Sequence, residues 1–309
     1  MTRLASPLSL PLPLFVRQHI DSGFHRLVHP PDEPVVDFNR PRGEAALVPP
    51  ESLSWRIFKN PVALFVGGVA AVILELAEPA VRTGVWEHSS FRTDPVRRLQ
   101  RTGNAAMVTV FAARSTAEAM IASIVRRHDR IAGETPDGEA YRANDVRVLC
   151  WVQATAAFGF ATAYDRYVRP LARDELDSFY AEGVPAAHLY GALDAPASDA
   201  ERQALFESMR LRLEPSPIVF EFLAIMRDAP AVPAPLRPMQ RRLVRAAVEI
   251  TPQWARRRLG LTGAYGLRPG ERLVVQQIAS LSDKLMLHSS PAVQSCLRLG
   301  LPADYLYPG

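Results

Sequence analysis

The sequence predicts one all-α domain, and three observations carry that prediction. Apolar residues recur at helical spacing through most of the chain from Leu53 onward. Helix-start residues, such as Asp94 followed by Pro95, come just before these segments. No segment shows the sustained apolar–polar alternation of a half-buried strand, and no Asn-Gly hairpin signal occurs. The composition, 48% apolar and 22% charged, is that of a globular protein, and 309 residues are compatible with one large domain.

Composition divides the chain into two regions. Residues 1–50 are rich in proline, which blocks helix interiors because it lacks a backbone donor. We therefore expect an extended N-terminal arm that lies on the domain. Three histidines, His19, His25 and His29, fall in this arm, where we do not expect a rigid metal site. Residues 51–309 are expected to form the helical domain.

A nearly all-apolar stretch follows the arm. We expect a helix from Trp55 to Ala77 that is buried on all sides. Gly67 and Gly68 lower its helix propensity, and they predict the close approach of another helix or of a flat ligand, unless they serve packing alone. The longest apolar run, Pro61–Leu74, is shorter than the roughly 20 residues of a membrane span and favours a buried helix.

Residues that favour a helix start predict the next two helices. Asp94 and Pro95 predict a helix that runs to about Ala113. Residues 115–118 (STAE) match a capping box, in which Ser and Glu satisfy each other's free backbone donors. The helix that this box opens is expected to end near Gly133.

The second half of the chain continues the helical pattern. Asn144 or Asp145 is expected to cap a helix that stops before Pro170. Further helices are expected at 173–182, 199–213, 217–228, 237–259 and 271–288.

Charge and cysteine content bear on several protein classes. The net charge is +4, but the basic residues lie mostly on amphipathic helices, and no recognition motif supports nucleic-acid binding. Cys150 and Cys296 form no CxxC pair, so we expect reduced, buried thiols rather than a zinc site or a disulfide. Prolines break the N-terminal apolar stretch, which lacks a clean cleavage site. We therefore expect a cytoplasmic protein without a membrane span.

Helical periodicity singles out His128. In the segment from Thr116 to Ile131, His128 continues the apolar row through Ile121 and Ile124, whereas its charged neighbours fall on the other side. A lone histidine on an apolar face is usually a hydrogen-bonded core residue. An inward imidazole on a helix is also the geometry that a haem iron requires of its proximal ligand.

Charged residues before this helix are further candidates. Arg98 and Thr102 are four apart and share a helix face, where an arginine can reach an anion such as a haem propionate or form a surface salt bridge. Arg101 offers a second cation. Glu75 and Glu78 follow the buried run, and a buried carboxylate either finds a partner or has a raised pKa and can act as a base. Pairing of Glu75 with Arg98 or Arg101 is the simpler alternative.

Motifs of other enzyme classes are missing from the sequence. It contains no Walker loop, no GxGxxG after a strand, no HExxH and no GxSxG. His-Ser-Ser occurs at 88–90 and at 288–290, but adjacent residues do not form a catalytic triad by themselves. Hydrolase chemistry is therefore not expected.

Several segments resemble a known family. They are similar to the bacterial oxygenase family that contains the latex clearing protein (rubber oxygenase) and the mycophenolic-acid-pathway oxygenase. The segments that carry the resemblance are 55–107 (WRIFKNPVALFVGG…TGNAAM), 144–168, 179–192 and 236–261. The resemblance covers roughly residues 50–300. It implies a globin-like helical core with additional helices, a b-type haem and the use of dioxygen.

The resemblance also implies roles for individual residues. In the rubber-cleaving members, an Arg and a Thr four apart lie near the haem, and the proximal His follows about thirty residues later. Arg98, Thr102 and His128 match that order, with 26 residues from Thr102 to His128. The resemblance therefore implies His128 as the iron ligand, with Arg98 and Thr102 ordering the haem or the polar network beside it.

The chain departs from the family pattern at three points. The residue before the Thr is a Lys in the rubber enzyme and can occupy the distal iron position; here it is Arg101, a poor ligand because it stays protonated, which implies an open or water-occupied distal site. Many members have a His where Gln153 stands, so we expect no iron ligand from that helix. The family's catalytic Glu has three candidate matches, Glu75, Glu78 and Glu87, of which Glu75 is favoured.

The sequence therefore predicts a haem b-dependent oxygenase that acts with dioxygen on an apolar substrate of isoprenoid or lipid type. His128 is the expected metal ligand, Arg98, Arg101 and Thr102 contact the cofactor or its polar surroundings, and Glu75 is the expected base. One alternative is a haem-binding protein without oxygenase turnover, for sensing, storage or peroxide chemistry. Another is a helical protein without a cofactor, in which His128 is only a core residue.

Overall fold

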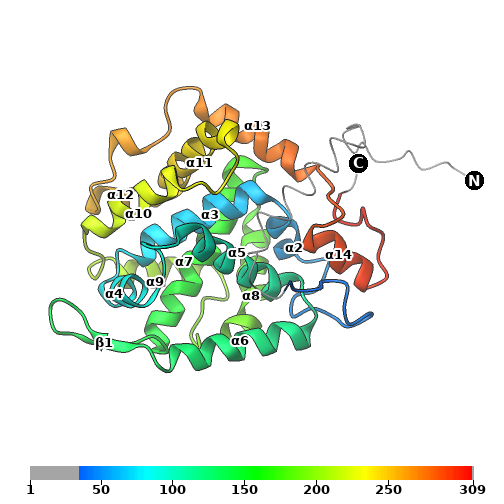
Figure 1. Cartoon of the computed structure of the whole chain (residues 1–309), viewed down its shortest axis with the longest axis horizontal. Helices are drawn as coiled ribbons and strands as arrows, with labels where there is room; N and C mark the ends of the chain where they lie inside the picture. Colours follow the sequence, from blue (N-terminus) through cyan, green and yellow to red (C-terminus); the bar gives the residue numbers. More distant parts are fainter. Residues whose placement is uncertain (1–34, 308–309) are drawn as a thin grey trace, which may run out of the picture.

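The computed structural model describes residues 35–307 as packed helices with one short hairpin (Figure 1). The predicted all-α domain is confirmed. The arm histidines His19, His25 and His29 lie outside the described residues. The α-helices are α2 (Leu53–Phe58), α3 (Pro61–Glu75), α4 (Pro79–His88), α5 (Pro95–Phe111), α6 (Arg114–His128), α7 (Val146–Tyr167), α8 (Arg173–Leu189), α9 (Asp199–Met209), α10 (Pro217–Asp228), α11 (Arg237–Ile250), α12 (Gln253–Arg258), α13 (Glu271–Asp283) and α14 (Pro291–Arg298). Two 3-10 turns, η1 (Ala234–Leu236) and η2 (Gly263–Tyr265), and the strands β1 (Ala132–Glu134) and β2 (Ala140–Arg142) complete the described elements.

Helices α3 and α7 cross in the middle of the molecule (Figure 1). A Cβ atom added to Gly67 of α3 would lie 2.7 Å from backbone atoms of Gly159 and Phe160 in α7. The two backbones are therefore in direct contact, which only glycine permits. Gly68 has just the ring of Phe160 near its Cβ position, at 3.9 Å. The predicted close approach is thus made by a helix, at Gly67.

Two apolar elements meet the length and composition of a membrane span. Helix α7 does so alone, with 56% of its most apolar 18-residue window buried inside the fold. Helices α3 and α4 do so only if they are counted together, although they bend by 111° at their junction. The run Pro61–Leu74 forms most of α3 and is largely buried in the core, as predicted.

The part of the N-terminal region from residue 35 onward packs on the helices. Phe38, Leu47 and Val48 are buried. The buried Arg298 of α14 donates hydrogen bonds to the carbonyl oxygens of Glu44 and Phe38, both at 2.9 Å. The last helix of the chain therefore anchors this segment.

Proline breaks two helices that the sequence pattern suggested were continuous. The side chain of Asn60 accepts from the backbone amides of Val62 and Ala63, so a new helix begins at Pro61 and the predicted helix from Trp55 is wrong as a single element. The predicted helix 237–259 is likewise two helices, because Pro252 follows the end of α11.

The predicted capping box at 115–118 is wrong. Helix α6 begins at Arg114 with Ala113 as its N-cap, and the carboxylate of Glu44 accepts from both the amide and the hydroxyl of Ser115. A distant residue thus replaces the local cap. The helix ends at His128 rather than near Gly133, so the histidine is its last residue.

The hairpin was not predicted. Strands β1 and β2 pair antiparallel around a turn in which Gly138 has a φ of +82°. The signal was Pro136-Asp137-Gly138, a turn sequence that we missed because no Asn-Gly was present. Helices α4 and α14 were also missed, and α8 continues to Leu189 past the predicted end at 182.

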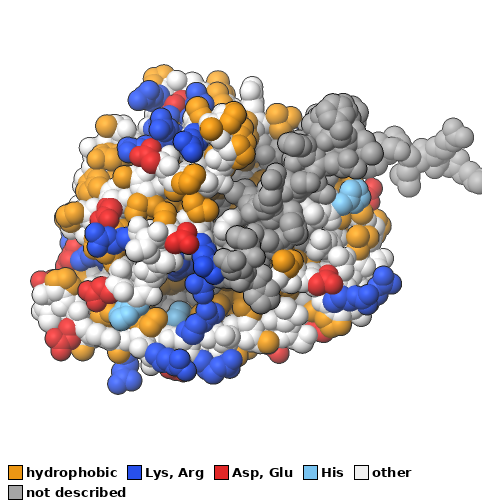
Figure 2. All heavy atoms as spheres, in the orientation of Figure 1, with side chains coloured by type: hydrophobic (Ala, Val, Ile, Leu, Met, Phe, Trp, Pro, Cys, Tyr) orange, Lys and Arg blue, Asp and Glu red, His pale blue; other side chains and the backbone are white. Residues whose placement is uncertain are grey.

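Other predictions hold in the described part of the chain. Asp94 caps α5, and Asp145 rather than Asn144 caps α7. Cys150 and Cys296 are buried and free. Figure 2 shows basic and acidic side chains interspersed on the displayed face, as expected of solvated helix surfaces.

Candidate functional site

Three of the predicted site residues, Glu75, Arg98 and His128, form one group in the structure. Glu75 is the last residue of α3, Arg98 lies in the second turn of α5, and His128 is the last residue of α6. The charge of Arg98 lowers the pKa of both Glu75 and His128. All three residues are half-buried. The fold therefore joins an acid, a cation and an imidazole from three different helices.

Desolvation dominates the ionisation of Glu75. It raises the pKa of the carboxyl from 4.5 to about 7, although Arg98 and Thr155 act in the opposite direction. The Thr155 hydroxyl of α7 lies 3.4 Å from Oε1 of Glu75 and bonds at the shorter distance of 2.9 Å to the carbonyl of Val152. Glu75 therefore has weak hydrogen bonding and exchanges a proton near neutral pH.

The other two candidate carboxylates have different surroundings. Glu78 is fully buried, accepts a hydrogen bond from the amide of Val81 at 2.8 Å as the N-cap of α4, and pairs with Arg147 at 2.9 Å. Glu87 is exposed at the end of α4. Of the three candidates, Glu75 is the one whose pKa is lowered by the charge of Arg98.

Arg98 is tied to its own helix. Its Nη1 donates to the hydroxyl of Thr102, which in turn donates to the carbonyl of Arg98 at 2.9 Å. The guanidinium also lies 5.3 Å from the ring centroid of Phe91. Burial lowers the pKa of Arg98, Glu75 raises it, and the nearby Arg101 lowers it further. Thr102 and Arg101 are exposed, so they lie at the rim of this group.

The imidazole of His128 is desolvated, and its Nδ1 atom has no hydrogen-bond partner. Desolvation is the largest effect and lowers the pKa of its imidazole, which favours the neutral form that binds metals. Its Nδ1 atom is buried and has no hydrogen bond of acceptable geometry, and the same is true of Oδ1 of Asn144. Asn144 nevertheless lies near enough to raise the pKa of His128 by side-chain hydrogen bonding.

Apolar residues one turn away from these groups are only half-buried. They include Val72 before Glu75, Ile124 before His128, and Val152 before Thr155. Elsewhere on the same helices, core residues such as Val69 and Ile121 are buried at 3% and 1% exposure. These three positions are therefore less covered by protein than the core positions of the same helices.

Within residues 35–307, no group of three or more His, Cys, Asp or Glu side chains is arranged to hold a metal ion. A bare metal ion is therefore not suggested by the described side chains. A haem needs only one axial protein ligand, because the porphyrin supplies the equatorial nitrogens. The imidazole of His128 is one described side chain of the type that would supply such a ligand.

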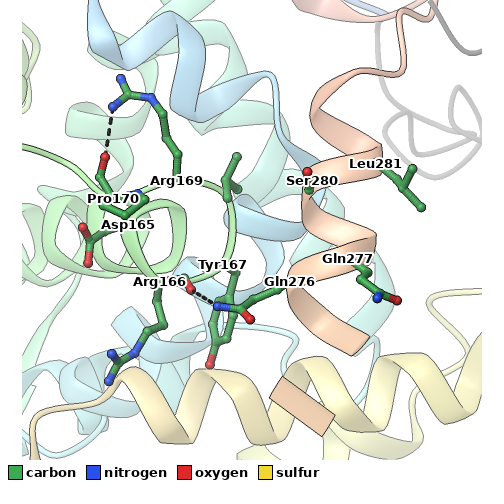
Figure 3. Close-up of a pocket in the computed structure, with 10 residues that line it drawn as sticks. Asp165, Arg166, Tyr167, Arg169, Pro170, Gln276, Gln277, Ser280 and Leu281 are labelled. Atoms are coloured by element: carbon green, nitrogen blue, oxygen red, sulfur yellow. Dashed lines mark hydrogen bonds between the residues drawn. The ribbon is translucent and has the colours of Figure 1, made fainter. Parts of the chain in front are cut away.

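Two surface pockets lie away from this group. One, of about 570 Å³, lies between the end of α7 and α13 (Figure 3), where the Gln276 amide donates to the carbonyl of Arg166 at 3.1 Å. In Figure 3, the side chains of Gln277 and Leu281 point away from α7. The other, of about 630 Å³, is lined by residues such as Phe158, Arg202 and Trp254. Neither pocket contains a predicted site residue, and neither gathers perturbed acids, bases and an imidazole.

Comparison with protein families decides the classification. The family described as "ER-bound oxygenase mpaB/B'/Rubber oxygenase, catalytic domain" matches residues 55–282. The chain belongs to this oxygenase family. No curated protein and no solved structure matches the chain. The family suggested by the sequence segments is thus confirmed.

The match to the oxygenase catalytic domain runs from α2 to the end of α13 and includes Glu75, Arg98 and His128. Sequence reasoning missed two residues beside them. Thr155 carried no signal, since its contact with Glu75 depends on how α3 and α7 cross. Asn144 was noticed as a candidate cap, but its contact with His128 depends on the unpredicted hairpin.

Proposed function

We propose that the protein is a haem b-dependent oxygenase that uses dioxygen to oxidise an apolar substrate. The proposal rests on two side chains: the half-buried carboxyl of Glu75, whose pKa burial raises to about 7 and whose Oε1 lies 3.4 Å from the Thr155 hydroxyl, and the imidazole of His128, whose buried Nδ1 has no hydrogen-bond partner. This group contains a candidate iron ligand, His128, and a candidate base, Glu75. Arg98 is the cation that influences the pKa of both. Membership of the oxygenase family supports the reaction class.

In this proposal, His128 holds the haem iron through a neutral imidazole, because burial disfavours its protonated form. Arg98 and Arg101 provide positive charge for an anionic group such as a propionate, and Thr102 fixes the direction of the Arg98 guanidinium. When bound, the haem supplies the binding and activation of dioxygen.

Glu75 is proposed as the residue that accepts or returns a proton at its carboxylate. Its pKa of about 7 leaves both protonation states populated near neutral pH, which suits a general base. Arg98 faces the charged form and stabilises it. The weak bond from Thr155 at 3.4 Å leaves the carboxylate free to contact a substrate or water.

The proposed substrate is an apolar molecule of isoprenoid or lipid type. Half-buried aliphatic residues lie one turn before the site residues, at Val72, Ile124 and Val152. Such surfaces bind hydrocarbon through apolar burial rather than through hydrogen bonds.

Absorption spectroscopy tests the cofactor. Protein expressed with a haem supply is expected to show a Soret band, and His128→Ala is expected to lose it. His88→Ala is the matched control, because His88 is also the last residue of its helix but is exposed. A colourless wild type, or unchanged haem in His128→Ala, contradicts the assignment.

Turnover separates an oxygenase from a haem-binding protein without activity. Haem-loaded protein is incubated with polyisoprene and with farnesyl-type lipids under oxygen, and carbonyl products are measured. Products that depend on Glu75 and on oxygen support the proposal. Haem binding without any product from apolar alkenes contradicts oxygenase function and favours the sensing, storage or peroxide alternative.

A further inference from the structure

Asn144 reaches back from the end of the hairpin to the end of α6. Its Nδ2 atom donates to the carbonyl of Val125 at 3.1 Å and to the carboxylate of Asp129 at 2.6 Å. The two ends of the hairpin segment are connected by a hydrogen bond from the backbone amide of Ala143 to the carbonyl of Ile131 at 3.0 Å. The hairpin therefore returns the chain to the helix terminus that carries the histidine.

These two bonds fix the orientation of the Asn144 amide. A backbone carbonyl and an ionised carboxylate only accept hydrogen bonds, so the group that faces them must be the NH₂. The carbonyl oxygen, Oδ1, then points elsewhere, and it is buried without a well-aligned partner. The buried Nδ1 of His128 likewise has no hydrogen-bond partner, and the Asn144 amide bonds to Val125 and Asp129, which lie on either side of His128 in the sequence.

We propose that Asn144 is the positioning residue of His128, whose Oδ1 accepts the Nδ1 proton and thereby leaves Nε2 unprotonated for the haem iron. The inference rests on the proposed function, because it assigns the tautomer of the ligand that the haem needs. A neutral imidazole carries its proton on one nitrogen only, so a proton held at Nδ1 places the free lone pair at Nε2.

The surroundings of His128 favour this arrangement. The neighbouring charges that affect the imidazole are Arg98, Arg127 and Asp129, and the amide of Asn144 satisfies part of the Asp129 carboxylate. Asn144 is itself neutral, so it orients the ring without drawing the proton away as a carboxylate would. Hydrogen-bond partners of this kind orient a ligating histidine and tune the metal.

The first test uses the protein without haem. Nitrogen-15 NMR of the imidazole of His128 is expected to show a protonated Nδ1 and an unprotonated Nε2 in the wild type. In Asn144→Ala the two tautomers are expected to mix. Asn104→Ala is the control, because Oδ1 of Asn104 is likewise buried without a partner but belongs to α5. A wild type with the proton on Nε2, or an unchanged tautomer in Asn144→Ala, overturns the inference.

The second test uses haem-loaded protein. Asn144→Ala is expected to weaken haem retention by about 10- to 100-fold, the usual cost of losing a residue that orients a metal ligand. Because this variant also frees the end of α6, the double variant Asp129→Asn/Asn144→Asp is compared with it. That exchange keeps the net charge and an amide–carboxylate pair and places a carboxylate on Nδ1. Like Asn144→Ala, it removes the donor to the carbonyl of Val125, so the two variants are matched in that loss.

The double variant is expected to retain haem and to have a more negative reduction potential, since a carboxylate strengthens electron donation from the imidazole. A role limited to holding the helix end would leave the potential unchanged, and that result would overturn the inference. Wild-type protein that binds no haem would instead refute the proposed function. The tautomer measured without haem stays informative in that case.

Discussion

Glu75 and Arg98, from two different helices, each shift the pKa of the other. Arg98 lowers the pKa of Glu75, and Glu75 raises the pKa of Arg98. Desolvation opposes both effects. For Glu75 desolvation is the larger effect, because the pKa of its carboxyl lies at about 7 rather than below 4.5.

The pH dependence of activity follows from this balance. If the carboxylate of Glu75 is the base, turnover is expected to rise with pH through about 7, where the group loses its proton. Glu75→Gln is expected to lower the rate and to remove this acid limb. Steady-state rates across the pH range measure it, with Glu87→Gln as the exposed control. An unchanged limb in Glu75→Gln assigns the titration to another group.

The contribution of Glu75 to the free energy of unfolding falls as the pH rises, whereas turnover is expected to rise. The pKa of Glu75 is 4.5 in the unfolded chain and about 7 in the folded protein, so the folded state binds this proton more tightly. The contribution is fully present below pH 4.5 and is lost as the pH rises through about 7. Relative to Glu75→Gln, the wild type is therefore expected to lose free energy of unfolding over that range. Urea denaturation of both proteins at several pH values checks the sign, and a wild type that gains stability relative to the variant contradicts it.

Replacing Arg98 tests its action on both neighbours. Arg98→Met removes the cation beside Glu75, so the acid limb of the pH–rate profile is expected to move to higher pH. The rate at the optimum is expected to fall by about 100-fold, the usual scale for losing one charge-stabilising group. Arg92→Met is the control, since Arg92 is 63% exposed and pairs with Glu221 at the surface. An acid limb that stays in place would show that Arg98 does not act on the base.

The helix crossing predicts a large effect of one methyl group. Gly159→Ala is expected to destabilise the protein by about 1–3 kcal/mol, because the new Cβ would overlap the backbone of Gly67. Gly183→Ala is the matched helical control, with no atom within 4 Å of its Cβ position. That control is expected to stabilise the protein by about 0.5–1 kcal/mol through helix propensity. Equal melting temperatures for the two variants would contradict a direct backbone contact.

Local signals predicted the helices well where the responsible residues are neighbours in sequence. Asp94 and Asp145 cap the helices that follow them, as their positions suggested. Prediction failed where a distant residue intervenes. The amide and hydroxyl of Ser115 donate to the carboxylate of Glu44 rather than forming a local capping box, and no spacing rule within residues 115–118 reveals that partner.

The candidate site shows the same division. Periodicity indicated that His128 faces the apolar side of its helix, and spacing placed Arg98 and Thr102 on one face. The influence of Arg98 on Glu75 depends on tertiary structure, so the sequence left three carboxylates open. The three carboxylates differ in burial in the structure. Glu78 is fully buried in an ion pair, Glu87 is exposed, and Glu75 is half-buried. The globin-like core, the haem and the boundary at residue 50 stay predictions.

The contact of Gly67 with Gly159 has a consequence for redesign of substrate range. Glu75 lies eight residues beyond Gly67, about 12 Å along the helix, and Thr155 lies one turn before Gly159. Any side chain that forces the two backbones apart would also move the carboxylate away from its hydroxyl partner. An engineer who wishes to admit bulkier molecules should therefore leave both glycines unchanged and vary half-buried positions such as Val72 and Val152, which lie outside the contact between the two glycines.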